Sequence, residues 1–115
     1  DDNCDTGNII LQNSFEICDF DTQESLYLKA MFLSMEKFNR VLLLVASGFK
    51  GVSQEGGGSY YGRGAPESGE INQYWKIDKI ERFIRAMKYP PYPYARFQNK
   101  EITSLNQYLE MVNEN

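Results

Sequence analysis

The sequence predicts an α/β fold. Three observations indicate this class: an alternating apolar and polar stretch near the start, a long stretch of helical periodicity after it, and a second helical stretch followed by a hairpin pattern. Alternation is typical of a strand with one buried face, whereas apolar spacing by threes and fours is typical of an amphipathic helix. We expect, in order, a strand, a long helix, a glycine-rich loop, a second helix and a β-hairpin within 115 residues, the length of one domain of about 100–150 residues.

The first predicted element is a strand over residues 8–18. Its apolar residues fall at odd positions, at Ile9, Leu11, Phe15 and Ile17. Residues 19–22 then predict a turn and a helix start, with either Asp21 or Thr22 as the capping residue.

A long helix is predicted over residues 23–46, ended by Gly48 as a left-handed cap. Six apolar residues spaced by threes and fours form one stripe along it: Leu28, Met31, Met35, Phe38, Leu42 and Val45. We interpret the stripe as core packing.

Residues 54–66 are rich in glycine. The lysine of the Walker pattern is missing, so the three adjacent glycines are interpreted as a connector and not as a phosphate loop. Tyr61 and Arg63 are different, because an arginine fork beside aromatic rings can hold a diphosphate. The alternative is that Arg63 anchors the acidic segment 67–70.

The last third predicts a second helix over residues 77–88. Its buried stripe is Ile77, Ile80, Phe83, Ile84 and Met87. Three prolines then predict an extended segment over residues 89–94, whose tyrosines line one wall of a cleft. A short hairpin of residues 95–97 and 101–103, turning at 98–100, and a weakly helical tail over residues 105–112 complete the chain.

Composition narrows the function. A net charge of −4 and a pI near 4.8 disfavour nucleic-acid binding. The longest apolar run, residues 41–46, is far shorter than the roughly 20 residues of a membrane span, and the acidic start does not resemble a signal peptide. Cys4 and Cys18 have no metal-ligand spacing and are expected to be free thiols in a cytoplasmic protein. The chain has no histidine, so a mechanism that needs an imidazole must take it from outside this chain.

Near the start, a carboxylate lies two residues before a glycine, directly ahead of the predicted strand. Gly7 permits backbone angles that other residues avoid and lets a ligand approach the main chain. The pattern predicts a tight loop that presents Asp5 at the mouth of the strand. Alternatively, Asp5 is only an acidic turn residue.

Four segments together resemble the folate-dependent formyltransferases. Residues 5–12 resemble their D-x-G-x-I-x-x-Q segment, and residues 61–66 resemble their arginine-proline segment. Residues 70–87 contain a match to their I-x-W … F-I-R-A stretch, and residues 92–97 stand where many members have P-x-P-G-A-F, with Tyr94 in place of the glycine. The resemblance covers about residues 5–103.

The resemblance implies the C-terminal half of a Rossmann-like formyltransferase domain. Members transfer a formyl group from formyl-tetrahydrofolate to an amine, without a metal, using an asparagine, a histidine and an aspartate. Asp5 matches the aspartate. The other two belong to an N-x-H motif on an earlier strand, so the folate-binding half is expected to be missing and residues 1–115 are expected to be inactive alone.

Among members, the sugar-nucleotide N-formyltransferases fit best, with an amino sugar on dTDP or UDP as acceptor. Gly7, Tyr61, Arg63, Tyr92 and Tyr94 are the expected substrate-binding residues. Purine-pathway formyltransferases lack the later segments. A methionyl-tRNA formyltransferase, disfavoured by the acidic charge, and a non-catalytic binding or assembly module remain alternatives. Without the rest of its sheet the chain would expose apolar surface, which predicts association with another copy or with the missing half.

Overall fold

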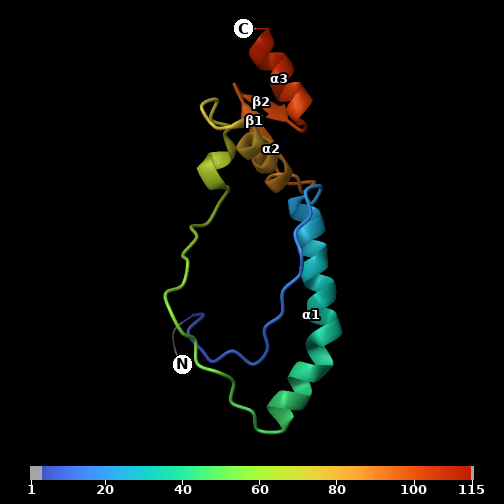
Figure 1. Cartoon of the computed structure of the whole chain (residues 1–115), viewed down its shortest axis with the longest axis vertical. Coiled ribbons are helices and arrows are strands. Elements are labelled where there is room, and N and C mark those ends of the chain that lie inside the picture. The colour runs from blue at the N-terminus through green and yellow to red at the C-terminus, as the bar shows by residue number, and fades with distance from the viewer. Residues whose placement is uncertain (1–3, 115) are drawn as a thin grey trace. The chain divides into compact units, whose positions relative to one another are not determined.

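The computed structural model describes residues 4–114 (Figure 1). Within them the order is α1 (Gln23–Ala46), a 3-10 turn η1 (Pro66–Gly69), α2 (Ile77–Ala86), β1 (Ala95–Phe97), β2 (Lys100–Ile102) and α3 (Leu105–Asn113). The chain divides into two compact units, one of residues 1–16 and 29–61 and one of residues 17–28 and 62–115. The mixed α/β class is confirmed, whereas the Rossmann-like architecture stays a prediction.

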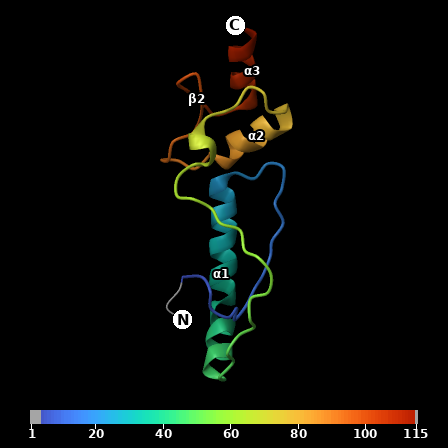
Figure 2. The same cartoon turned by 90° about the vertical axis from the view of Figure 1, so that its left-hand side faces the viewer.

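The second unit contains the hydrophobic core. Residues from α2, the hairpin and α3 pack together in this unit, whose elements Figure 2 shows from a second side. The buried side chains are Ile71, Ile80, Phe83, Ile84, Met87, Ala95, Phe97, Ile102 and Tyr108. The predicted stripe of the second helix is therefore confirmed at four of its five positions, and Ile77 is the exception with 48% of its surface exposed.

A polar network ties the residues before α1 to α2. Thr22 is the cap of α1, since its Oγ1 accepts a hydrogen bond from the Ser25 amide while its own amide donates to Ser25 Oγ. Asp21 is buried, and its carboxylate accepts from the Cys18 amide and from Ser25 Oγ. Arg85 donates to the Asp21 carbonyl at 2.8 Å. Hydrogen bonding of Arg85 to Glu81 also raises the Arg85 pKa.

The hairpin confirms the prediction with a shift of one residue in its second strand. β1 and β2 pair antiparallel, with Phe97 opposite Lys100. Gln98 and Asn99 both have positive φ, of 49° and 64°, as a two-residue type I′ turn requires. The helical tail is also confirmed, and Ser104 Oγ caps α3 by accepting from the Gln107 amide.

The predicted strand over residues 8–18 is wrong within the described structure. Only Ile9 pairs, through two 2.8 Å hydrogen bonds with Val52. A strand is stable only where a neighbour satisfies its N–H and C=O groups, and no other described segment pairs with residues 11–18. Its expected buried face is exposed as well, by 40% at Phe15 and 71% at Ile17.

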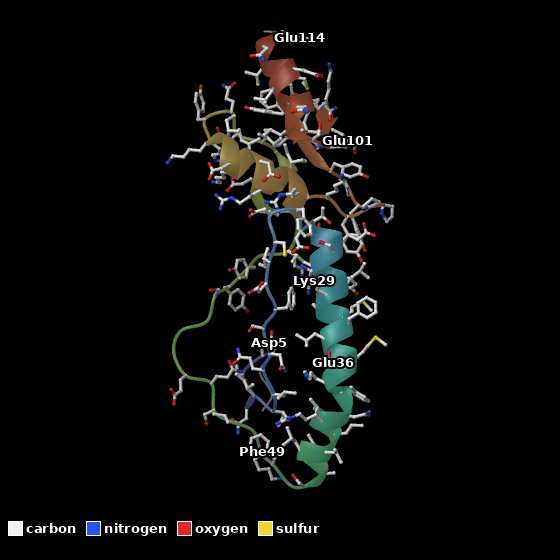
Figure 3. All side chains as sticks on the ribbon, turned by 45° about the vertical axis from the view of Figure 1, so that its right-hand side comes forward. Asp5, Lys29, Glu36, Phe49, Glu101 and Glu114 are labelled. Carbon is white, nitrogen blue, oxygen red and sulfur yellow. The ribbon has the colours of Figure 1, made fainter. Side chains whose placement is uncertain are left out.

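The bounds of α1 match the predicted helix, and Gly48 has the φ of +84° expected of its cap. The expected core packing is wrong, because no residue of α1 is buried. Side chains extend from the α1 ribbon around the labelled Lys29 and Glu36 (Figure 3). All six residues of the predicted stripe are exposed, since the described chain supplies too little structure to cover a helix of this length. The expected exposure of apolar surface is confirmed. No described helix is long and apolar enough to cross a membrane.

The proline segment is a turn and not the predicted extended stretch. The Tyr92 amide donates to the Tyr89 carbonyl at 2.8 Å, and the Pro90–Pro91 peptide is cis. Pro90 and Pro91 occupy the two central positions of this four-residue turn and have no backbone N–H to donate. The hydrogen bond from Tyr92 to Tyr89 therefore closes the turn.

Because α2 contributes buried residues to the core, we expect a substitution there to have a large effect on the free energy of unfolding. Ile80 is fully buried, so Ile80→Ala is expected to lower the free energy of unfolding of the second unit by about 2–5 kcal/mol. The matched change Ile77→Ala, on the same helix at a half-exposed position, is expected to cost less than about 1 kcal/mol. Urea unfolding followed by the fluorescence of Trp75, which packs against this core, measures both. Equal losses would show that the core is not built around Ile80.

Candidate functional site

Asp5 lies in a turn that the first unit holds in place (Figure 3). Its φ is +60°, a conformation that Asp and Asn adopt more readily than most residues. Gln54 Nε2 donates to the carbonyl of Asp5 at 2.9 Å and to the carbonyl of Gly7 at 2.7 Å. The Asp5 side chain is exposed, and no hydrogen bond or ion pair joins its carboxylate to another described residue. The structure therefore presents this carboxylate to solvent from a held turn.

The chain comes very close to itself beside this turn. Gly51 has φ of +80°, and a Cβ atom built on it would lie 2.8 Å from Asn8 Cβ and 2.9 Å from the Ile9 carbonyl oxygen. Asn8 Nδ2 also donates to the Lys50 carbonyl at 2.9 Å. Only glycine fits at this approach. Residues 50–54 thus hold residues 5–9.

Tyr61 and Arg63 lie in the irregular segment between α1 and η1. Both are exposed, Tyr61 by 86%. The alternative role of Arg63 as an anchor for residues 67–70 is wrong for Glu70, whose carboxylate pairs with Arg96 at 2.9 Å, and no other described acidic residue forms an ion pair with Arg63. Its guanidinium is therefore available to an anion.

The second unit has a hollow of about 380 Å³ beside the prolines. Its lining is largely apolar, with the Tyr92 ring at one side and the Gln23 amide as a polar group; the full lining is Gln23, Gly64, Ala65, Pro66, Ala86, Met87, Tyr92 and Pro93. An apolar pocket with few polar groups is typical of a small-molecule site. Because Gly64 lines it, the adjacent Arg63 is one residue from its rim.

The ring of Tyr92 belongs to a cluster of three tyrosines. Tyr89 packs edge-on against Tyr92, with ring centroids 5.4 Å apart, and Tyr27 of α1 lies 5.5 Å from Tyr89. Loss of hydration, reinforced by Tyr27, raises the Tyr89 pKa. Tyr94 is partly buried and lies neither in this cluster nor among the residues that line the hollow.

The structure groups the predicted residues only in part. Asp5 and Gly7 lie in the same turn of the first unit. Tyr61 belongs to the first unit as well, but not to this turn. Tyr92 and the neighbour of Arg63 share one hollow in the second unit. No set of three or more acidic or cysteine side chains suited to a metal ion occurs among the described residues.

Sequence reasoning missed Gln54, Gly51 and Gln23. Gln54 and Gly51 contact residues more than forty positions away in the sequence, and no local sequence pattern predicts such contacts. Gln23 lies at the first position of α1, where its sequence neighbours indicate only a helix start.

Comparison with known proteins adds to this geometry. No family model matches the chain. Two proteins named GDP-perosamine N-formyltransferase, from Brucella melitensis biotype 1 and Brucella abortus strain 2308, are each 40% identical over 95 residues, or 83% of this chain. The chain is a relative of the sugar-nucleotide formyltransferases. The resemblance found in its motifs is confirmed.

The aligned residues make up 37% of the length of each Brucella enzyme. The relationship to sugar-nucleotide formyltransferases thus extends over most of this chain and over little more than a third of those enzymes.

Proposed function

We propose that this chain is the aspartate-bearing, C-terminal half of the catalytic domain of a sugar-nucleotide N-formyltransferase. The supporting observation is the 40% identity, over 83% of the chain, to two enzymes named for formyl transfer to GDP-perosamine. The reaction transfers a formyl group to the amine of a nucleotide-linked amino sugar. The proposed donor is formyl-tetrahydrofolate, which supplies the formyl carbon.

Asp5 is the proposed catalytic residue. When the amine of the acceptor forms its bond to the formyl carbon, the nitrogen becomes an ammonium and must lose a proton. An exposed carboxylate accepts that proton directly or through water, and it also orients an imidazole. The carbonyl oxygen gains negative charge in the same step and needs hydrogen-bond donors. In the family that the motifs resemble, an asparagine and a histidine donate these hydrogen bonds; this chain has no histidine, and we propose that the other half of the domain supplies both residues. The bond between the formyl carbon and the nitrogen of the formyl donor then breaks, that nitrogen takes up a proton, and the products are tetrahydrofolate and a formamide on the sugar.

The hollow beside Tyr92 is the proposed nucleotide site. Its apolar lining and the exposed Tyr92 ring suit a flat base, and Arg63 near its rim suits a diphosphate. Gly7, Tyr61 and Tyr94 remain proposed acceptor contacts. Because both Brucella relatives are named for a GDP-linked sugar, we propose GDP in place of the dTDP or UDP that the sequence motifs suggested.

The apolar surface of α1 is the proposed contact with the rest of the domain. A helix with apolar residues on more than one side is normally buried, yet Met35, Phe38 and Leu43 are exposed by 69%, 59% and 72%. The proposed covering structure is the part of such a domain that corresponds to the residues outside the aligned 37% of the Brucella enzymes. Without it we expect the chain to be inactive. A second copy of the chain is the alternative occupant.

A cytoplasmic location is part of the proposal. No disulfide joins Cys4 and Cys18 in the described structure, which suits a reducing compartment. No partner nucleic acid or membrane enters the proposed reaction.

An exchange of segments tests the function. In a chimeric enzyme, residues 5–103 of this chain replace the matching segment of the Brucella melitensis enzyme. Mass spectrometry then follows formyl transfer to a GDP-linked amino sugar, a dTDP-linked amino sugar and methionyl-tRNA. Transfer to the GDP-linked sugar alone is expected. Transfer to methionyl-tRNA would favour the tRNA enzyme, and no transfer would favour a non-catalytic module.

The nucleotide site makes a separate prediction for the 115-residue chain. Tyr92→Ala is expected to weaken GDP binding by about 5- to 150-fold, because base stacking on an aromatic ring contributes about 1–3 kcal/mol. The control is Tyr74→Ala, another tyrosine of the second unit, which is 87% exposed and outside the hollow. Isothermal titration with GDP measures both. Equal affinities for the two variants would rule out stacking on Tyr92.

A further inference from the structure

The Asp5 turn is fixed by a side chain distant in sequence. Gln54 Nε2 has two N–H groups, and the carbonyls of Asp5 and Gly7 accept them at 2.9 and 2.7 Å. A carboxamide nitrogen can satisfy both acceptors at once. The two carbonyls lie on either side of Thr6, so one side chain spans the whole turn.

The backbone pairing next to the turn sets the position of Gln54. Ile9 and Val52 form an antiparallel bridge with 2.8 Å hydrogen bonds in both directions. Two steps further along the same register, Gly7 faces Gln54. The close approach of Gly51 to Asn8 and Ile9 fixes that register. Gln54 therefore reaches the turn because of the pairing, and a shift by one residue would move it away.

The turn has a conformation that needs such support. Asp5 has φ of +60°, and a non-glycine residue persists there only where its surroundings hold it. Its own carboxylate does not do so, since it bonds to no other described residue. The two hydrogen bonds from Gln54 thus restrain the main chain from which that carboxylate projects.

We propose that Gln54 is a positioning residue for the catalytic carboxylate of Asp5. The inference rests on the proposed function, which assigns the proton transfer to Asp5. Gln54 acts through the main chain of the turn and leaves the carboxylate free for the reaction. Its loss is expected to lower kcat more than it raises KM, because Tyr92 and Arg63, the proposed nucleotide contacts, lie in the other unit, and of the proposed acceptor contacts only Gly7 accepts a hydrogen bond from Gln54.

The test compares Gln54→Glu with Glu55→Gln. The first change keeps the size of the side chain and removes both N–H donors. The second replaces glutamate with glutamine, the reverse exchange, at the neighbouring position 55, whose side chain is exposed. Gln54→Lys restores N–H donors and serves as the rescue variant.

Two measurements are made on these variants. In the 115-residue chain, Gln54→Glu is expected to speed hydrogen exchange of the Ile9 amide by about tenfold, because the two hydrogen bonds that hold the turn are lost. In the chimeric enzyme it is expected to lower kcat by about tenfold or more, with a smaller change in KM. Gln54→Lys should recover both quantities, and Glu55→Gln should change neither.

The possible results test the role of Gln54 separately from the proposed formyltransferase function. Unchanged exchange of Ile9 in Gln54→Glu would overturn the restraint. Faster exchange with normal kcat would overturn the positioning role. A parent chimera without formyl transfer would overturn the proposed function and with it the role in catalysis, while the exchange of Ile9 would still decide whether Gln54 holds the turn.

Discussion

Asp5→Asn is expected to lower the kcat of the chimeric enzyme by about 10²- to 10⁴-fold, the usual contribution of a positioned acid or base. Asparagine has the same shape and lacks the basic carboxylate oxygen. It also tolerates positive φ as well as aspartate does, so the turn at φ +60° is expected to remain folded. The measurement is single-turnover formyl transfer, followed by mass spectrometry.

Asp19→Asn is the control for this change. Asp19 is also an exposed aspartate in a turn, and it belongs to the second unit. Its variant is expected to keep the parent kcat within about twofold. Near-normal turnover in Asp5→Asn would show that Asp5 is only a turn residue.

Gly51→Ala is expected to have the second large effect, through the support of the same turn. The new methyl group would overlap Asn8 Cβ and the Ile9 carbonyl oxygen, both less than 3.0 Å away, and would also force alanine to φ of +80°. Overpacking costs about 1–3 kcal/mol, and the left-handed conformation costs about 1–2 kcal/mol more. We expect the pairing of Ile9 with Val52 to be lost, and the kcat of the chimeric enzyme to fall with it.

Two other glycines separate the causes. Gly48 has φ of +84° with open space around it, and Gly57 has open space without the positive φ. Gly48→Ala should therefore show the conformational cost alone, and Gly57→Ala should show neither cost. Hydrogen exchange of the Ile9 and Val52 amides measures each variant. Equal protection in Gly51→Ala and Gly57→Ala would contradict the close approach.

The elements that were predicted correctly depend on nearby residues. The bounds of α1, the stripe of α2 and the cap at Gly48 follow from spacing within one or two turns. The strand over residues 8–18 failed because its hydrogen-bond partners must come from another segment, and in the described structure only Val52 pairs with it. The apolar stripe of α1 is typical of a helix that packs against other structure. The stripe does not show whether the structure that packs against it belongs to residues 1–115.

The same distinction explains the candidate site. Asp5 is a candidate because of the motif around it, and Tyr92 and Arg63 are candidates because of their residue types beside proline and glycine. Gln54 was missed because its contacts with Asp5 and Gly7 depend on how residues 5–9 pair with residues 50–54, and neither segment alone predicts that register. The grouping of Tyr27 with Tyr89 was missed for the same reason, since α1 and the proline turn are far apart in sequence.

The most direct test is complementation between separate chains. The 115-residue chain is titrated into the Brucella melitensis enzyme from which the matching segment has been removed, and formyl transfer to a GDP-linked amino sugar is measured. Our account predicts that neither piece is active alone and that activity rises to a plateau as the chain is added. The Asp5→Asn chain should bind equally well and restore no activity. Activity that is absent with the native chain, or equal with the Asp5→Asn chain, would contradict the assignment of this chain as the aspartate-bearing half of a formyltransferase.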